Sequence, residues 1–464
     1  MPWLLVLASA AVFSVLGYRA WTGHLGLAAL VLLVASAGMY FAGRRGLTKQ
    51  SRKQTDMIAK VLFTLVGMMA LLRHPIGFEA ADGTKTELPL YEAIGQYITE
   101  VDPQTFVIFA LVAMAVKFVG VIASAFAWHL LLVGQGIRYP FWSKIFTAFL
   151  IGRFIGTFMP STIGLDGYTL YEAGRYSNEW TRVITAKTLE KFIGITGLFL
   201  GMVLTMPFGY SVIVEVAQKL EVPDAAPALA GAILVIAGGV STVVVVGLVW
   251  PVFLVGLMGV VKTVLSKIMI GPLGKISDKV LNLADDFTDA VGAYHGKVGL
   301  FMAALAAKFV THFTTFVVYY FTGLAIGVVA LEFWPVVFGS SIQVLATVLS
   351  PTIAGEGARE AFQALLLSSQ YGGVAQAVLA GALGFVIRDF DPTEMQAGVE
   401  AVHQGKLWLP PESTYEVLRE TAPELGISAE DRRNRLMTIV LGLVPLTGLV
   451  AALTALLWRK YWGH

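Results

Sequence analysis

The chain alternates between long apolar stretches and shorter polar segments. Near its start, apolar stretches cover Pro2–Tyr18, Leu25–Ala42 and Met57–Leu72, and a polar segment then follows up to Gln104. Apolar stretches of roughly 17–25 residues are long enough to cross the hydrocarbon core of a bilayer as helices. The pattern therefore predicts a three-span N-terminal extension with an extracytoplasmic segment, residues 1–104.

The rest of the chain contains two series of apolar stretches with the same order of features. Each series predicts a long span containing a lysine, a helix pair broken by proline and glycine, and two further spans. The first series is residues 105–261 and the second is residues 298–458. An amphipathic pattern at helical spacing predicts a cytoplasmic connector, 262–297, with a solvated helix as the alternative. A polar segment, 388–435, predicts a soluble insert.

Two local matches relate the series to each other. MAVKFV around Lys117 resembles LAAKFV around Lys308, and MPSTIGLDG resembles SPTIAGEG. Pro160 follows Lys117 at the same separation as Pro351 follows Lys308. A fixed separation between similar segments indicates an internal repeat.

The repeat has a consequence for membrane topology. A hairpin that enters and leaves by one face leaves each series with an odd number of crossings, so the second series is inverted relative to the first. The sequence thus predicts an all-α polytopic membrane protein, built as an inverted-topology repeat with re-entrant hairpins at 139–175 and 333–369. The basic loop Arg44–Lys53 places its end of the protein in the cytoplasm and predicts a multi-pass protein of the inner (cytoplasmic) membrane.

Composition supports the membrane class and limits the chemistry. The chain is 56% hydrophobic and 14% charged, whereas soluble domains carry about 25% charged residues. Its net charge of +2, with scattered basic residues, gives no support for nucleic-acid binding. Cysteine is absent, the seven histidines lack metal-ligand spacing, and no P-loop motif occurs. We therefore expect no cofactor, no metal and no enzymatic activity.

Four basic residues inside apolar stretches are candidate substrate-binding residues. A charge at bilayer depth costs at least ~2.5 kcal/mol, so Lys117 and Lys308 are expected to face protein or water. They are predicted to hold an anionic headgroup, with a salt bridge to an acidic residue of a hairpin break, Asp166 or Glu356, as the structural alternative. Arginine forms bidentate contacts with phosphate. Arg153 and Arg359 are candidates for that role, with pairing to Glu172, Glu360 or a carbonyl as the alternative.

Acids and helix-breaking residues gather at the two breaks. The acids are candidates for proton coupling or gating, and helix N-capping explains them equally well. The Glu190–Lys191 pair on the following span is a further candidate. The breaking residues are expected to permit the backbone turns. The acids are Asp166, Glu356 and Glu360, and the breaking residues are Pro160, Gly164, Gly167, Pro351, Gly355 and Gly357.

Both breaks resemble motifs of the lysylphosphatidylglycerol synthase/flippase transmembrane family. In the first half, Met159-Pro160, Asp166-Gly167 and Glu190-Lys191 with Gly194 stand where that family has a break, a Gly-Asp pair and a Glu-Arg pair. The second motif is PTIAGEGARE, in which Gly355, Gly357, Arg359 and Glu360 match residue by residue. The Asp-Gly order and Lys191 depart from the family pattern. The resemblance covers about residues 105–387.

The resemblance implies lipid translocation. We do not expect lipid aminoacylation, because the sequence offers only the insert after Arg388 and no soluble aminoacyl-transfer domain. We expect a flippase for an anionic or phosphate-bearing lipid, such as a phospholipid or a polyprenyl phosphate, that moves through a midplane cavity between the repeats. One alternative is a secondary transporter of a small anionic solute. Another is a non-transporting scaffold whose partners are envelope-lipid biosynthetic enzymes. A membrane enzyme acting on polyprenyl lipids is the fourth class, and no DDxxD-type acid cluster supports it.

Overall fold

The structure is a computed structural model in which the described chain is almost entirely helical. It describes residues 2–21, 27–79, 85–158, 163–250, 296–350 and 357–389, together with Gly292, Tyr294 and Gly355. Six helices in these ranges are long and apolar enough to cross a membrane, which confirms a polytopic helical membrane protein. They are Pro2–Arg19, Lys49–Arg73, Pro103–Gly134, Trp180–Thr205, Pro223–Gly247 and Val298–Ala325.

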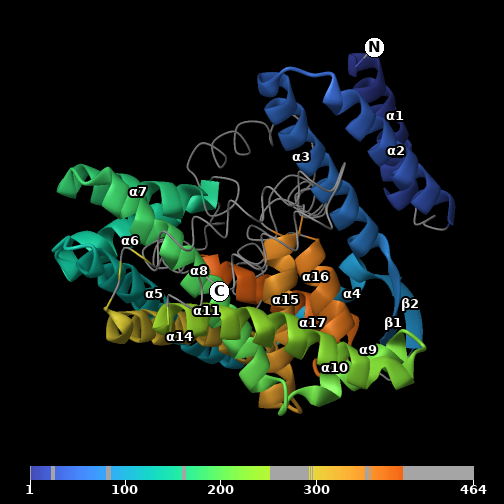
Figure 1. The fold of residues 1–464 in the computed structure, drawn as a ribbon. Coiled ribbons are helices and arrows are strands. Elements are labelled where there is room, and N and C mark those ends of the chain that lie inside the picture. The colour runs from blue at the N-terminus through green and yellow to red at the C-terminus, as the bar shows by residue number, and fades with distance from the viewer. Residues whose placement is uncertain are drawn as a thin grey trace, which may run out of the picture.

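The first three helices form a unit at one side of the molecule (Figure 1). Helices α1 (Pro2–Trp21) and α2 (Leu27–Arg45) pack against each other, and α3 (Lys49–Arg73) packs against α1. The Ser9 hydroxyl donates to the backbone carbonyl of Ser36 at 2.8 Å, which satisfies a buried polar group at the α1–α2 contact. An ion pair of 2.6 Å between Arg44 Nε and Asp56 Oδ1 joins α2 to α3.

The polar segment after α3 folds as a hairpin and a short helix. Strands β1 (Pro75–Glu79) and β2 (Lys85–Pro89) pair antiparallel, and α4 (Leu90–Glu100) follows directly. This two-stranded sheet is an addition to the expected all-α fold. α4 buries Leu90, Ala93, Ile94 and Ile98, whose i, i+3, i+4 spacing places them on one face. Asp102 caps the next helix by accepting from the Thr105 amide, and this hydrogen bond lowers the pKa of its carboxyl.

The centre of the fold is an antiparallel pair of long helices, α5 (Pro103–Gly134) and α14 (Val298–Ala325). Their direction follows from the contacts at their ends. The Tyr294 hydroxyl, just before α14, donates to the Leu131 carbonyl near the end of α5, at 2.7 Å. Further along α14, the Thr315 hydroxyl accepts a hydrogen bond from Lys117, which lies in the first half of α5. In a membrane these two helices therefore run in opposite directions.

Two pairs of shorter helices follow α5 and α14. A π-helical turn, Phe141–Phe146, leads into α6 (Thr147–Phe158), which packs on α7 (Ile163–Ser177). In the second half, α15 (Phe333–Leu349) packs on α16 (Ala358–Leu367). At 1.5 Å per residue these helices are about 15–26 Å long, less than the ~30 Å hydrocarbon core. Such lengths fit the predicted re-entrant hairpins, which stay a prediction.

The remaining helices enclose the central pair. α8 (Trp180–Thr205) packs on both α5 and α14. α9 (Tyr210–Lys219) precedes a nearly continuous helix made of α10 (Ala226–Ile233), a π-helical segment and α11 (Gly239–Val249). α17 (Val374–Asp389) packs on α14, α16 and α4.

Several predicted features lie outside the described residues. These are the connector apart from its last residues, the insert beyond Asp389, the last predicted span at 437–458, and three residues of the breaks: Pro160, Pro351 and Glu356.

Gly197 on α8 provides a test of the packing between α8 and α14. A β-carbon at Gly197 would lie 2.9 Å from the backbone carbonyl carbon of Lys308, so there is no room for a larger residue. Gly194 lies on the same helix and would meet nothing within 4 Å. We expect Gly197→Ala to lower the free energy of unfolding by about 1–3 kcal/mol, the usual cost of overpacking. Gly194→Ala is expected to change it by less than about 1 kcal/mol. Thermal denaturation in a single detergent measures both; equal melting temperatures would contradict the close contact.

Candidate functional site

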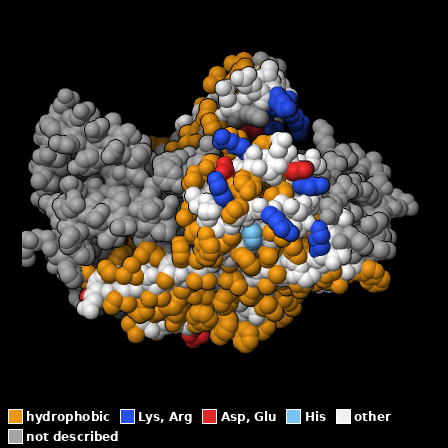
Figure 2. All heavy atoms as spheres, turned by 90° about the vertical axis from the view of Figure 1, so that its left-hand side faces the viewer, with side chains coloured by type: hydrophobic (Ala, Val, Ile, Leu, Met, Phe, Trp, Pro, Cys, Tyr) orange, Lys and Arg blue, Asp and Glu red, His pale blue; other side chains and the backbone are white. Residues whose placement is uncertain are grey.

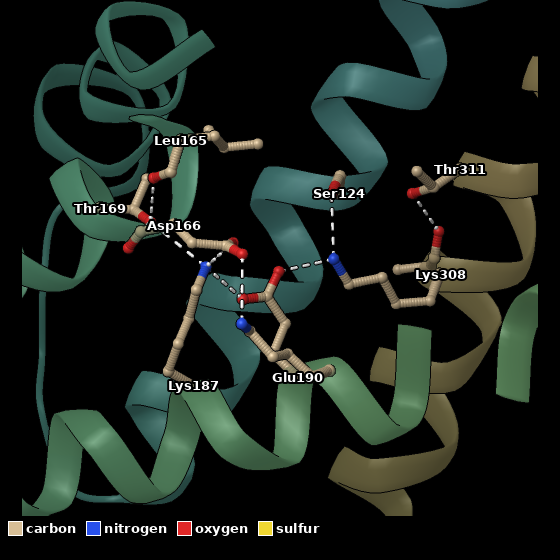
Figure 3. Close-up of polar contacts among 10 residues, drawn as sticks. Ser124, Leu165, Asp166, Thr169, Lys187, Glu190, Lys308 and Thr311 are labelled. Atoms are coloured by element: carbon tan, nitrogen blue, oxygen red, sulfur yellow. Dashed lines mark hydrogen bonds and ion pairs between the residues drawn. The ribbon is translucent and has the colours of Figure 1, made fainter. Parts of the chain in front are cut away.

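A chain of ion pairs that ends in a hydrogen bond connects four helices (Figure 3). It runs from Asp166 on α7, through Lys187 and Glu190 on α8, to Lys308 on α14 and Ser124 on α5. The successive distances are 2.9 Å from Asp166 Oδ1 to Lys187 Nζ, 2.7 Å from Lys187 Nζ to Glu190 Oε2, and 2.6 Å from Glu190 Oε1 to Lys308 Nζ. Lys308 Nζ also donates to Ser124 Oγ at 3.0 Å.

Glu190 is the shared member of this network. Each of its carboxylate oxygens faces a different lysine, Lys187 one turn away on the same helix and Lys308 on a neighbouring helix. All three residues are buried, with Glu190 only 6% exposed. A buried charge is tolerated where an opposite charge and hydrogen bonds compensate it. Glu190 thus allows two lysines to lie inside an apolar helix bundle.

Lys187 is the functional candidate that the sequence did not single out. Its ammonium lies between the carboxylates of Asp166 and Glu190, and it also donates a hydrogen bond to the Thr169 hydroxyl at 3.2 Å. The face of the Trp128 ring lies 4.9 Å from it, which adds a cation–π contact. The available signal was the i, i+3 spacing of Lys187 and Glu190 within one apolar span.

The network extends toward the surface at Asp166. This residue lies in the first part of α7, where its charge suits the helix N-terminus. Its second oxygen is 3.4 Å from the ammonium of Lys191, whose side chain is 61% exposed. Glu190 and Lys191, adjacent in sequence, therefore have different environments: one is buried between two lysines and the other faces outward. The network joins the protein interior to its surface.

The two lysines of the predicted repeat make reciprocal contacts. Lys117 Nζ on α5 donates to Thr315 Oγ1 on α14 at 2.8 Å, while Lys308 Nζ on α14 donates to Ser124 Oγ on α5. The sequence offset that relates Lys117 to Lys308 also relates Ser124 to Thr315. Such reciprocity is the property of an interface between two-fold-related elements. Lys308 adds the ion pair with Glu190. Of the two acids that the sequence suggested, Asp166 pairs with Lys187 and Lys191 instead, and Glu356 lies outside the described residues.

The second break brings Arg359 and Glu360 together at the start of α16. Arg359 Nε donates to Glu360 Oε1 at 2.8 Å, and the Gly357 amide donates to Glu360 Oε2 at 2.8 Å. Both side chains are completely buried. The structure therefore contains the two structural alternatives considered for this motif, pairing of Arg359 with Glu360 and capping of the helix N-terminus by the glutamate.

Glycine is required at this break for conformation and for space. Gly355 and Gly357 have φ values of +78° and +79°, in the left-handed region that favours glycine. A β-carbon on Gly355 would lie 2.2 Å from Thr347 Cγ2 near the end of α15. In the first hairpin, Gly164 and Gly167 lie in the first part of α7 and Arg153 lies on α6, partly buried.

Basic side chains gather on the face of the molecule formed by α6, α7 and the start of α8. Figure 2 shows lysine and arginine side chains on this face above a broad hydrophobic surface. Exposed basic residues in this part of the chain include Arg138 and Lys144, which precede α6, Arg175 on α7, and Arg182 and Lys191 on α8. A basic rim above an apolar surface is the arrangement expected at the level of anionic lipid headgroups. In the described part of the chain, no three His, Asp or Glu side chains are grouped as a metal site requires.

Long apolar helices around a buried ion network define a multi-pass membrane protein. The family described as lysylphosphatidylglycerol synthase TM region matches residues 91–393, more than half of the chain, so the chain belongs to this family. This confirms the resemblance inferred from the break motifs. No curated protein and no solved structure matches the chain.

The shared position of Glu190 predicts the stability of variants in the network. Glu190→Gln removes the carboxylate that two buried lysines share, and we expect the free energy of unfolding to fall by about 3–5 kcal/mol. Lys191→Met, on the exposed side of the same network, is expected to cost less than about 1 kcal/mol. Thermal denaturation in detergent compares the two variants with the wild type. A Glu190→Gln variant as stable as Lys191→Met would show that Glu190 is not the counter-ion of both lysines.

Proposed function

We propose that this protein moves a lipid with an anionic, phosphate-bearing headgroup across the cytoplasmic membrane. The observation that carries the proposal is the buried network in which Lys187 and Lys308 share Glu190. Family membership adds support, because the resemblance implies lipid translocation.

Lys187 offers a phosphate the contact that Asp166 provides in the structure, and Asp166 keeps Lys191 as a partner. A lysine ammonium has three N–H donors and binds phosphate as a point charge. Lys308 already directs two of its donors to Glu190 and Ser124. A phosphate oxygen can exchange with a carboxylate oxygen without leaving either charge uncompensated, which is the costly event in a buried ion pair.

The charges of the network also balance around a headgroup with one negative charge. Asp166 is partly exposed and is already bonded to the exposed Lys191, so these two residues can move away as a neutral pair. Lys187, Glu190 and Lys308 then carry one net positive charge. A phosphodiester with one negative charge neutralises it, and the basic face of α6, α7 and the start of α8 supplies the approach (Figure 2).

The arrangement of α5 and α14 supports alternating access. The two helices are antiparallel and exchange equivalent lysine–hydroxyl bonds, as expected for the first helices of an inverted-topology repeat. In transporters of this architecture the substrate site lies at the repeat interface, and one half rocks against the other. Lys117 and Lys308 both lie at that interface.

Lipid transfer in proteoliposomes tests the proposal. Lys187→Met and Lys308→Met are expected to lower transfer of a fluorescent anionic phospholipid about tenfold or more, because each removes a charged hydrogen bond of about 1.5–3 kcal/mol. Lys117→Met is expected to lower it less, since Lys117 lies outside the ion-pair chain. Lys60→Met, an exposed lysine on α3, is the matched control and is expected to transfer at the wild-type rate.

Loss of folding is separated from loss of transfer by a charge-balanced variant. The double variant Lys308→Met with Glu190→Gln removes one charge of each sign and leaves Lys187 paired with Asp166. It is expected to fold and insert but to transfer poorly. Normal transfer in this variant would refute the site. Uptake of glycerol phosphate in place of lipid would identify a carrier of small anionic solutes instead.

A further inference from the structure

A second buried polar group lies in the α15–α16–α17 part of the molecule. Its members are completely buried and include neutral side chains in addition to the Arg359–Glu360 pair. They are Ser340 and Gln343 on α15, and Arg359, Glu360 and Gln363 on α16.

The packing of the hairpin places these side chains on facing surfaces. A β-carbon on Gly339 would contact Leu367 at the end of α16, and one on Gly355 would contact Thr347 near the end of α15. α15 and α16 are thus antiparallel and in close contact, and Gly355 lies beside the end of α15. Gln343 lies one turn after Gly339 and one turn before Thr347 on the same face. It therefore faces α16, between the contacts of Gly339 and Thr347.

Gln363 belongs to the same region and also contacts α17. A β-carbon on Gly381 of α17 would lie 3.0 Å from Gln363 Cγ, so this glycine makes room for the glutamine side chain. Gln363 is thereby enclosed by two neighbouring elements without contact with solvent.

Polar atoms of this group lack hydrogen-bond partners. In the described residues, Ser340 Oγ and Gln343 Oε1 form no hydrogen bond, and the amide of Gln363 forms none of normal geometry, its one polar neighbour among them being the Tyr371 hydroxyl. Buried polar atoms are nearly always bonded in native proteins, and an exception requires an explanation such as a water or a ligand. Three fully buried side chains with unbonded polar atoms on two packed helices point to a bound polar group.

We propose that the α15–α16–α17 group binds the ring hydroxyl groups of a polyhydroxylated lipid headgroup, such as inositol or a sugar. The group has no net charge, because Glu360 neutralises Arg359. Its unbonded atoms include both donors and acceptors, and hydroxyl groups act as both. This chemistry differs from that of the lysine network, which suits a phosphate. The inference rests on the proposed function for its assumption that the ligand is a lipid.

Binding measurements on the purified full chain test the proposal with three lipids that have the same acyl chains. Phosphatidylinositol carries a phosphate and hydroxyls, phosphatidate carries the phosphate alone, and glucosyl-diacylglycerol carries hydroxyls alone. Native mass spectrometry gives their relative affinities. We expect the wild type to prefer phosphatidylinositol over phosphatidate by about tenfold or more, which corresponds to one or more net hydrogen bonds.

Variants of the two glutamines assign that preference to the group. Gln363→Met and Gln343→Met keep the side-chain length and remove the amide, so they are expected to reduce the preference about tenfold, toward equal binding. Their melting temperatures are expected to be unchanged or raised, because an unbonded buried amide is replaced by an apolar group. Gln218→Met, an exposed glutamine on α9, is the matched control and is expected to keep the preference.

The outcomes separate this inference from the proposed function. If Lys308→Met weakens both phosphate lipids but the glutamine variants keep the wild-type preference, the inference fails and the proposed function stands. If glucosyl-diacylglycerol binds in a Gln363-dependent way and phosphatidate does not bind, the proposed function fails and the inference stands. Equal binding of phosphatidylinositol and phosphatidate by the wild type overturns the inference. It is also overturned if the glutamine variants melt at lower temperatures and keep the lipid preference, because the glutamines would then serve helix packing alone. Absence of binding by all three lipids overturns both.

Discussion

The shared carboxylate of Glu190 is the interaction on which the central arrangement depends. Two lysines inside an apolar bundle are tolerated because this one carboxylate compensates both, with Asp166 as a second partner of Lys187. Since Lys308 comes from α14 and Lys187 from α8, the same carboxylate fixes how these helices face each other. Lys187 also holds α7 in place through its ion pair with Asp166, and Lys308 holds α5 in place through its hydrogen bond to Ser124. Close packing adds to this, because the backbone of Lys308 rests against Gly197.

The sequence was informative where a single helix contains the signal and uninformative where the signal depends on how helices face each other. Long apolar runs identified the spans, and the cost of burying charge identified Lys308 as a site candidate. Its partner could not be read in the same way, because Asp166, Glu190 and Glu356 are all acids next to breaks or on spans. Lys187 was missed for a related reason: an i, i+3 lysine–glutamate pair is an ordinary helix feature until a third charge from another helix joins it.

The two halves of the protein are alike along the central helices and different at their hairpins. Lys117 and Lys308 make equivalent hydroxyl contacts, and Lys308 also forms an ion pair with Glu190 on α8. In the first hairpin the acid Asp166 pairs with lysines of α8, whereas in the second the acid Glu360 pairs with Arg359 on its own helix. On the predicted repeat, the packing of the central helices is thus kept while the chemistry of the two helix pairs differs. One half presents cationic groups that suit a phosphate, and the other presents neutral amides and hydroxyls.

The exposure of the carboxylates determines which part of the network can respond to a ligand. Glu190 is enclosed by two lysines, and moving it would uncover both charges at once in a low-dielectric interior. Asp166 is partly exposed and has Lys191, at the surface, as a second partner. Moving Asp166 therefore removes one partner from a single buried charge, the ammonium of Lys187, and this ammonium keeps its ion pair with Glu190. Under the proposed function, the headgroup exchanges with Asp166 while Glu190 stays in place. The complex is then neutral in charge without uptake of a proton, so the charge balance of the site alone does not require coupling to a proton gradient.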